Sequence, residues 1–215
     1  MSQEDIQAFV SHLAIEALQK KMKDCIQYGT VNVYQHGLAV RAEWFKILNY
    51  INSGDRVWEQ AFRCPRWLKD YRLDIQETMP PFAIMSSYVV YHDCGKPFCQ
   101  TEDTGGKIHF PDHAKMSGTI WRETQHPHAE RIASLMERDM DIHLLKPEGV
   151  EEFAKFDDCV GLLLAGLAEI HANCEMFGGP ESQGFKIKYA QIDRRGKAVC
   201  QLVFGEPERY DGNQC

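Results

Sequence analysis

The chain has 215 residues, of which 44% are hydrophobic and 26% are charged, and its formal net charge at pH 7 is −7. A chain of this length and composition is expected to bury one sizeable core as a single soluble domain. The negative charge argues against binding along duplex DNA, which needs many lysine and arginine contacts to phosphates. It still allows a local basic or metal-containing site to bind one small phosphorylated ligand.

The sequence lacks signals for membrane insertion and secretion. It has no apolar run of the roughly 20 residues that cross a bilayer. Its start, MSQED, has neither the basic segment nor the apolar centre of a secretory signal. The eight cysteines are scattered and form no CxxC pair, so neither a zinc ribbon nor a disulfide framework is indicated. We therefore expect a reduced, cytoplasmic protein with no membrane partner.

Apolar residues recur mostly at helical spacing, which predicts an all-α fold. Ser2 followed by Asp5 resembles a capping box at the start of a first helix. A second helix is expected to begin after Asn32 and to end at the sequence Asn-Ser-Gly at 52–54. A third follows Pro81 and continues to the His-Asp pair at 92–93. Further helices are expected over about 111–122, 127–140 and 149–177.

Two segments depart from the helical pattern. Residues 98–110 contain the turn sequence Asp-Thr-Gly-Gly and predict a loop or small hairpin. Between Phe185 and Phe204, apolar residues alternate with lysines and then meet the turn-like sequence Asp-Arg-Arg-Gly, which predicts a β-hairpin over 185–204. The sequence therefore predicts a compact all-α helical bundle with a small C-terminal β-hairpin, in one domain over residues 1–215.

Five polar residues share a helix face with predicted core residues, namely His36, His92, His113, Asp139 and His171. A lone histidine on such a face is more often a hydrogen-bonded core residue than a metal ligand, and Asp139 could pair with a nearby arginine. Because burying a polar group is costly unless its lone pairs are used, five such residues in one small domain favour a metal site. Imidazole and carboxylate ligands together suit Mn, Fe, Zn, Ni or Co, with Mg less favoured.

The sequence His-Asp-Cys-Gly-Lys-Pro at 92–97, with a histidine upstream, resembles the signature of the HD-domain metal-dependent phosphohydrolase superfamily. The sequence HFPDHAKMSG at 109–118 and the segment 125–139 make the likeness closest to the HD domain of bacterial tRNA nucleotidyltransferases, over about residues 31–178. No strand-rich nucleotidyltransferase pattern precedes residue 31, so CCA addition is not expected. The family usually has a histidine at the place of Asp139 and an aspartate at the place of His171.

The resemblance implies a metal centre in an HD-type helical bundle. His36, His92, Asp93 and one residue of the last long helix would surround a divalent ion that keeps an open position for water. A second ion, where present, would share Asp93 and would also be held by His113 and Asp139. Such an ion lowers the pKa of a bound water molecule toward neutrality, so that hydroxide can attack phosphorus near neutral pH.

The same resemblance assigns roles to residues near the predicted metal. Asp93 and Lys96 are expected to be catalytic, with Lys96 also holding a phosphate oxygen as a point charge. An exposed loop lysine is the plain alternative for Lys96. His109 and Lys115 are candidates for substrate binding and for protonating the leaving group.

The fourth ligand of the first ion is a choice among residues of the helix predicted over 149–177. His171 lies four residues after Leu167 and continues the apolar face. Glu169 lies about 200° around the axis from Leu167 and should face solvent. The aspartates at 157–158 lie on the order of 20 Å earlier along the helix. We therefore predict His171 as the ligand.

The substrate is not defined by these residues, and three function classes stay open. The first is a phosphomonoesterase or phosphodiesterase acting on nucleotides or on RNA ends that carry 2′- or 2′,3′-cyclic phosphates. The second is a deoxynucleoside triphosphohydrolase or 5′-nucleotidase. The third is a nucleotide-binding protein with a degenerate site. Whether the chain forms a homodimer is also left open.

Overall fold

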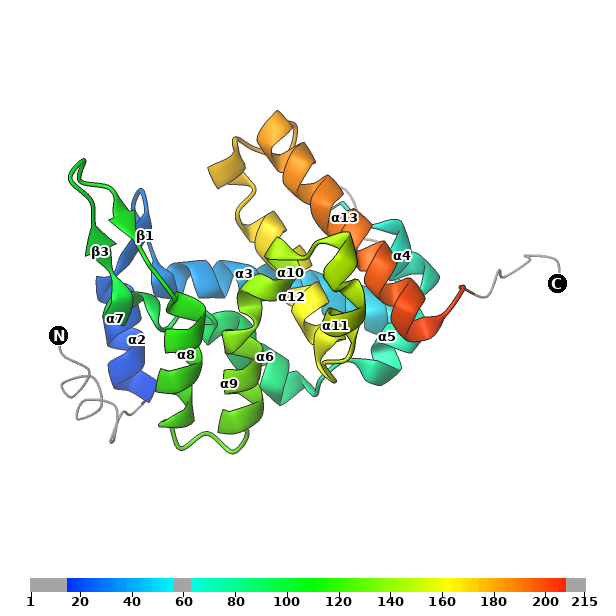
Figure 1. Cartoon of the computed structure of the whole chain (residues 1–215), viewed down its shortest axis with the longest axis horizontal. Coiled ribbons are helices and arrows are strands. Elements are labelled where there is room, and N and C mark those ends of the chain that lie inside the picture. Colours follow the sequence, from blue (N-terminus) through cyan, green and yellow to red (C-terminus); the bar gives the residue numbers. More distant parts are fainter. Residues whose placement is uncertain (1–14, 56–62, 208–215) are drawn as a thin grey trace. The chain divides into compact units, whose positions relative to one another are not determined.

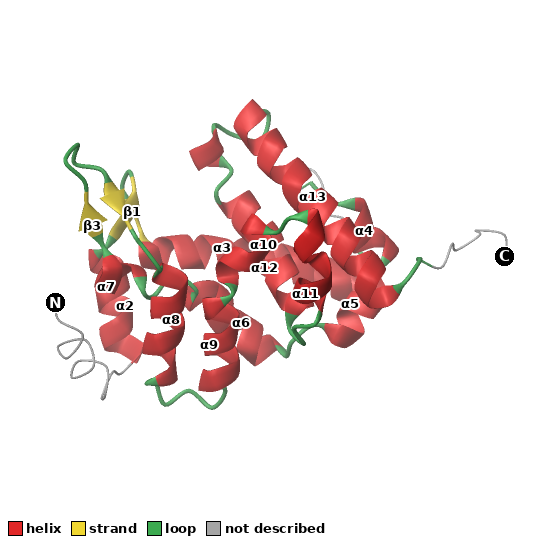
Figure 2. Cartoon of the chain, in the orientation of Figure 1, coloured by secondary structure: helices red, strands yellow, loops and turns green. Residues whose placement is uncertain are grey.

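The computed structural model describes residues 15–55 and 63–207 (Figure 1). The chain divides into two units, one within Met1–Trp44 and Pro80–Asp141 and the other within Phe45–Met79 and Ile142–Cys215. Most described residues are helical, and the few strands form two small hairpins (Figure 2). The predicted mostly helical fold is confirmed, whereas the single domain stays a prediction.

The first unit is built from short helices and both hairpins. Its elements are α2 (Ile15–Asp24), β1 (Ile26–Tyr28), β2 (Val31–Asn32), the first half of α3 (Val33–Ser53), α6 (Phe82–Tyr91), α7 (Lys96–Cys99), β3 (Thr101–Glu102), β4 (Ile108–His109), α8 (His113–Arg122), α9 (Ala129–Glu137) and the start of α10 (Asp139–Leu144). Strands β1 and β2 pair antiparallel, as do β3 and β4. The segment 98–110, for which a loop or a small hairpin is predicted, contains the β3–β4 hairpin.

Helices α8 and α9 lie side by side in the first unit, and α6 packs against α9 (Figure 1). Trp121 of α8 and Leu135 of α9 are fully buried. Arg122 at the end of α8 forms ion pairs with Glu130 and Glu137 of α9. This layer of helices supports the end of α6, where the chain reaches the His-Asp pair.

A glycine sets how closely α3 approaches α6. A Cβ atom at Gly37 would lie 2.0 Å from the carbonyl oxygen of Val90, a distance that no side chain tolerates. Since Gly37 follows His36 and Val90 precedes His92 by two residues, this backbone contact fixes the spacing between the two histidines. Val40 and Trp44, which lie on the same side of α3 as Gly37, are also buried.

The second unit is wholly helical in its described residues. Its elements are the second half of α3, α4 (Arg66–Asp70), α5 (Arg72–Thr78), the end of α10, η1 (Pro147–Gly149), α11 (Val150–Ala154), α12 (Cys159–Ala172), η2 (Glu175–Phe177) and α13 (Gln183–Phe204). Helix α13 packs against α4, α11 and α12. Nearly every residue of α12 is buried, in keeping with its apolar sequence.

The β-hairpin predicted over 185–204 is wrong, because this segment is the helix α13. Ser182 caps its start by accepting a hydrogen bond from the backbone of Phe185. The buried residues Phe185, Ile192, Gly196, Val199 and Cys200 lie at helical spacing, whereas Ile187 of the apparent alternation is 48% exposed. Gly196 is not in a turn; it lies where α13 crosses the ring of Trp67, which a Cβ atom would approach to 2.3 Å.

Other helix boundaries follow the predictions except in two segments, of which the first is the helix expected over 127–140, interrupted at Arg138 between α9 and α10. The helices expected after Asn32 and Pro81 are α3 and α6. The helix expected over 149–177 is broken, since α11 ends at Ala154 and α12 begins at Cys159. The capping box at Ser2 and Asp5 lies outside the described residues. No helix in the described ranges has the length and apolar character needed to span a bilayer.

We predict that Gly37→Ala lowers the free energy of unfolding by about 1–3 kcal/mol, because the new methyl group forces α3 away from α6. Gly149→Ala is the matched control, since its nearest neighbour would be a flexible leucine side chain 3.5 Å away. Urea denaturation of both variants measures the effect. A Gly37→Ala protein as stable as the wild type would contradict the packing described for α3.

Candidate metal centre

The His-Asp pair lies where α6 ends. Helix α6 finishes at Tyr91, and the chain then makes a tight turn through Asp93 into α7. The backbone N–H of Lys96 donates to the carbonyl of Asp93, and the backbone N–H of Gly95 donates to Ser117 Oγ of α8. His92 and Asp93 are only 3% and 2% exposed. The turn therefore places a carboxylate and an imidazole inside the protein.

Three histidines face the Asp93 carboxylate. His92 Nε2 lies 3.3 Å and His36 Nε2 3.7 Å from Oδ2, and His113 Nε2 lies 3.5 Å from Oδ1. His36 comes from α3 and His113 from the first turn of α8. Gly95 allows α8 to come this close, because a Cβ atom there would lie 2.5 Å from the backbone of α8. Asp93, His36, His92 and His113 therefore form one group, called below the Asp93 cluster.

Backbone carbonyls orient two of these imidazoles. His92 Nδ1 lies 3.1 Å from the carbonyl of Val89, and His113 Nδ1 lies 2.9 Å from the carbonyl of Phe110. A carbonyl only accepts, so Nδ1 carries a hydrogen in both rings and Nε2 is the ring nitrogen directed toward Asp93. Histidines that bind metals through Nε2 are held in the same way.

The spacing of the donor atoms fits a shared metal ion. Two atoms bound to one ion at about 2.1 Å and at a tetrahedral angle lie about 3.4 Å apart. The distances from Asp93 Oδ2 to the Nε2 atoms of His92 and His36 bracket this value, at 3.3 and 3.7 Å. Ligand atoms of these three buried residues all lie within 4.8 Å of one another. His36, His92 and Asp93 could therefore hold a metal ion.

The Asp93 carboxylate is ionised and is paired with Lys96. Burial by itself would raise the pKa of Asp93, but the charges of Lys96, His92 and His36, with a hydrogen bond from His92, hold it well below the usual range. Lys96 Nζ donates to Asp93 Oδ2 at 2.6 Å, and its side chain is only 11% exposed. Lys96 is thus a buried residue bonded to the Asp93 cluster and not an exposed loop lysine.

Asp139 lies in the first unit beside this cluster. Its carboxylate is buried, and Oδ1 accepts a hydrogen bond of 2.5 Å from the hydroxyl of Tyr88. A ligand atom of Asp139 lies within 4.8 Å of one of His92. The structure therefore brings together His36, His92, Asp93, His113 and Lys96, with Asp139 next to His92.

His109 and Lys115 have more exposed positions. His109 lies on β4, and its Nε2 is 2.9 Å from Asp103 Oδ2 in the β3–β4 hairpin. Lys115 is exposed in the first turn of α8. Their predicted roles in substrate binding stay predictions.

His171 belongs to the second unit and lies among aromatic rings. Its ring meets Phe185 and Tyr189 edge-on, with centroids 5.4 and 6.0 Å apart. Burial lowers the pKa of His171 to about 3; a hydrogen bond with the backbone of Arg63 opposes this shift, and the charges of Lys46 and Arg63 add to it. Its assignment as a metal ligand stays a prediction.

The prediction that Glu169 faces solvent is wrong. Its side chain is 21% exposed and lies 2.7 Å from His143 Nε2 within the second unit. Within α12, the residues that are not buried are Glu169 and Ala172, three apart on one side of the helix, so Glu169 lies on the least buried side but pairs there with His143.

Sequence reasoning missed Tyr88 as a site residue. Tyr88 lies four residues before His92, and a tyrosine hydroxyl that is buried usually has a polar partner. Ser117, which receives the N–H of Gly95, also gave no signal in the sequence.

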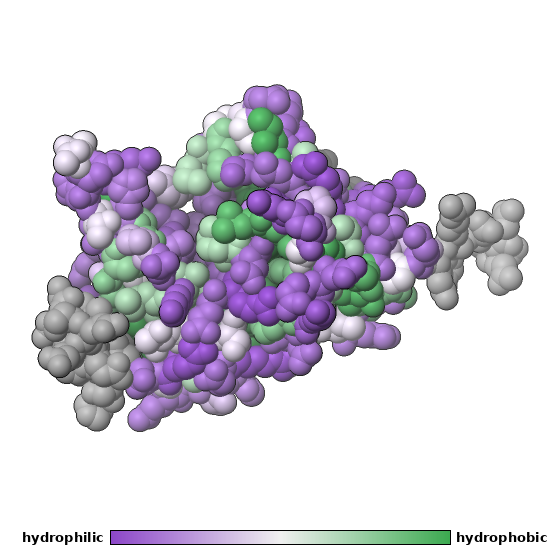
Figure 3. All heavy atoms as spheres, in the orientation of Figure 1, coloured by the Kyte–Doolittle hydropathy of each residue, from purple (hydrophilic) through white to green (hydrophobic). Residues whose placement is uncertain are grey.

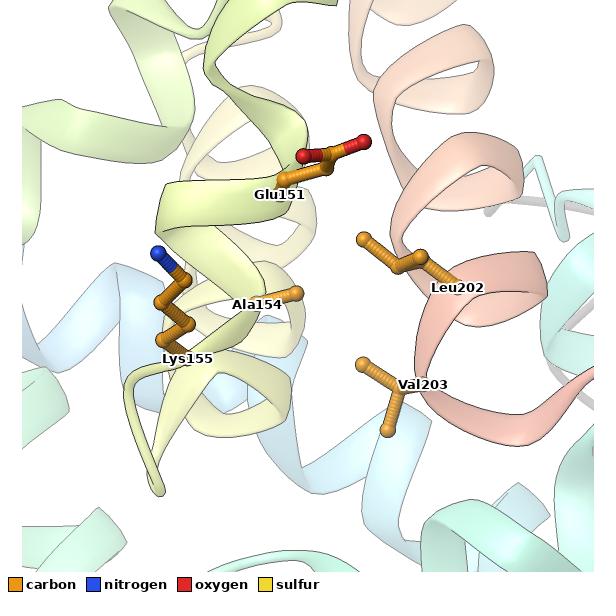
Figure 4. A pocket seen from close by; sticks show the side chains of 5 residues that line it. All are labelled: Glu151, Ala154, Lys155, Leu202 and Val203. Carbon is orange, nitrogen blue, oxygen red and sulfur yellow. The ribbon is translucent and has the colours of Figure 1, made fainter.

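The second unit has a shallow hollow of about 370 Å³ between α11 and α13 (Figure 4). Ala154, Leu202 and Val203 face one another across it, while the Lys155 ammonium points away. Figure 3 shows hydrophobic surface in this area, in keeping with the 49% exposure of Leu202. The hollow is apolar at its centre, and Glu151 and Lys155 lie at its edge.

We predict that His171 makes the protein less stable in acid. Its pKa is about 6.5 in an unfolded chain and about 3 in the folded protein, so the unfolded state binds more protons between these values. The free energy of unfolding should therefore fall as the pH drops below about 6.5, by up to about 1.4 kcal/mol per pH unit. His171→Leu should remove this part of the slope. Urea denaturation from pH 7 to pH 4.5 measures it, and equal slopes for both proteins would contradict the burial of a neutral His171.

Comparison with known proteins leaves the family of this chain open. No family model matches the sequence, and neither a curated protein nor a solved structure matches it. The likeness to HD-domain phosphohydrolases therefore rests on the sequence motifs alone. The structure contributes the buried group of His36, His92 and Asp93, which could hold a metal ion.

Proposed function

We propose that this protein is a metal-dependent phosphohydrolase that acts on nucleotides or on RNA ends carrying 2′- or 2′,3′-cyclic phosphates. The observation that carries the proposal is the buried Asp93 carboxylate, faced by three imidazole Nε2 atoms and paired with Lys96. The order of these residues in the sequence, with the His-Asp pair at the end of a helix, supports a phosphate ester as the substrate.

The residues that would hold the metal follow from the donor atoms. His36, His92 and Asp93 would bind one ion, and His113 and Asp139 are the candidates for a second that shares Asp93. This mixture of nitrogen and oxygen donors favours Mn, Fe, Co, Ni or Zn over Mg. A bound divalent ion would supply a Lewis acid and would lower the pKa of a water molecule.

The chain itself supplies orientation and charge. The carbonyls of Val89 and Phe110 fix two imidazoles, so their Nε2 atoms are already oriented for binding a cation. Lys96 adds a positive charge within hydrogen-bonding distance of Asp93. A local positive charge of this kind can attract a phosphate even though the whole protein is acidic.

Two observations bear on the other function classes. The departures from the family pattern at Asp139 and His171 favour the alternative of a nucleotide-binding protein with a degenerate site. No residue described above separates a deoxynucleoside triphosphohydrolase or a 5′-nucleotidase from an enzyme of RNA ends.

The seven cysteines in the described ranges are free thiols, which supports our proposal of a cytoplasmic location.

Metal-stripped protein reloaded with Mn, Fe, Co, Ni, Zn or Mg should hydrolyse at least one member of a panel of phosphate esters. The panel contains 2′,3′-cyclic nucleotides, RNA with cyclic phosphate ends, 5′-nucleotides and deoxynucleoside triphosphates. Product chromatography identifies which phosphorus is attacked. Asp93→Ala should reduce turnover to background and lower the bound metal, whereas Asp24→Ala, at a 61% exposed aspartate of α2, should leave both unchanged.

The outcome of that panel decides among the classes. Metal binding without hydrolysis of any ester would favour the degenerate nucleotide-binding protein. Undiminished turnover in Asp93→Ala, measured after removal of contaminating phosphatases, would refute the proposal.

Lys96→Ala should lower kcat/KM by about 10- to 150-fold, the equivalent of about 1.5–3 kcal/mol for a lost hydrogen bond to a charged group. The bound metal should be retained, because the ammonium competes with a cation for Asp93 Oδ2. Steady-state kinetics and metal analysis test both parts, with Lys20→Ala at a 77% exposed lysine as the control. Loss of metal in Lys96→Ala, or unchanged kinetics, would argue against this role.

A further inference from the structure

Tyr88 makes a buried contact with a candidate metal ligand. Its hydroxyl donates a hydrogen bond of 2.5 Å to Asp139 Oδ1, and the two residues are only 1% and 6% exposed. Hydrogen bonds from a hydroxyl to an ionised carboxylate are short and are stronger than those between neutral groups. The contact thus restrains the Asp139 carboxylate in a place where water has little access.

The position of Tyr88 on α6 links this contact to the Asp93 cluster. Tyr88 lies one helical turn before His92, and the two rings meet edge-on with centroids 6.4 Å apart. A ligand atom of Asp139 lies within 4.8 Å of one of His92. A single helix therefore presents an imidazole donor and, one turn earlier, the hydroxyl that holds a neighbouring carboxylate.

We infer that Tyr88 is a positioning residue of the metal centre, which orients Asp139 so that its carboxylate can bind a divalent cation beside His92. Hydrogen bonding of Oδ1 to the phenol favours coordination through the other carboxylate oxygen. Carboxylate ligands in metal sites are commonly held by such outer hydrogen bonds, whose loss weakens metal binding by about 10- to 100-fold. This inference rests on the proposed function for the presence of the metal, but it concerns binding and not hydrolysis.

A purely structural role is the competing explanation. A buried carboxylate needs a hydrogen-bond donor whether or not a metal binds. In that case removal of the hydroxyl would lower stability and leave the metal affinity of the folded protein unchanged. The two explanations therefore differ in the metal affinity measured on folded protein.

The test compares two tyrosines of α6. Tyr88→Phe removes the hydroxyl that contacts Asp139 and keeps the ring in the core. Tyr91→Phe is the matched control, because the Tyr91 hydroxyl accepts a hydrogen bond of 2.5 Å from Gln19 and, within the described residues, makes no hydrogen bond to a candidate ligand. Binding of Mn²⁺ to the full chain is followed by electron paramagnetic resonance, after circular dichroism has shown that each variant is folded.

We expect the Kd for Mn²⁺ to rise by about 10- to 100-fold in Tyr88→Phe and to stay unchanged in Tyr91→Phe. Tyr88→Phe should add little when Asp139→Asn is already present, because the hydroxyl acts through that carboxylate. Wild-type affinity in Tyr88→Phe, or an equal further loss in the Asp139→Asn background, would overturn the inference.

The metal-binding test of Tyr88 and the hydrolysis test of the proposed function can fail independently of each other. If the wild type binds Mn²⁺ but hydrolyses no phosphate ester, the proposed function fails while the effect of Tyr88 on metal affinity still decides the inference. If hydrolysis occurs and Tyr88→Phe binds Mn²⁺ normally, the inference fails alone. A wild type that binds no divalent cation would overturn both.

Discussion

The charge of Asp93 is the constraint on which the arrangement of the first unit depends. An ionised carboxylate in an apolar interior is unfavourable by several kcal/mol unless charges and hydrogen bonds compensate for the lost water. Helices α3, α6, α7 and α8 each contribute to that compensation, through His36, His92, Lys96 and His113. The helices can approach closely enough because glycines lie at two of the contacts, Gly37 and Gly95. Packing and electrostatics therefore impose the same geometry on this part of the chain.

The parts of this arrangement that were predictable from the sequence are the ones that depend on local pattern. Helices α3, α6 and α8 follow from apolar spacing together with a proline or a glycine at their ends, and the β3–β4 hairpin follows from its turn residues. That His36 and His92 meet could not be derived from spacing. It was expected from the motif alone, and its physical cause, the backbone contact between Gly37 and Val90, depends on tertiary packing.

The wrong prediction of a β-hairpin over 185–204 arose because the local sequence pattern is compatible with both a strand and a helix. Phe185, Ile187 and Tyr189 alternate like a strand, but Phe185 and Tyr189 are also four residues apart and share a helix face. In the sequence Gly196 indicated a turn. In the structure a glycine is needed there because the ring of Trp67, from another helix, packs directly against the backbone of α13. A short alternating run and a glycine cannot distinguish these cases, because the partner that decides between them is distant in the sequence.

Burial on an apolar helix face does not by itself identify a metal ligand, as His92 and His171 illustrate. Both satisfy the same sequence pattern, and both are buried. The ring of His92 has a carbonyl at Nδ1 and a carboxylate at Nε2, so Nε2 is directed at a charged group. The ring of His171 is flanked by Phe185 and Tyr189, and burial strongly disfavours its charged form. What distinguishes the two is the chemistry of the neighbours, which a helical stripe does not encode. The same reasoning draws attention to Tyr88, whose hydroxyl gives Asp139 the kind of polar neighbour that a ligand requires.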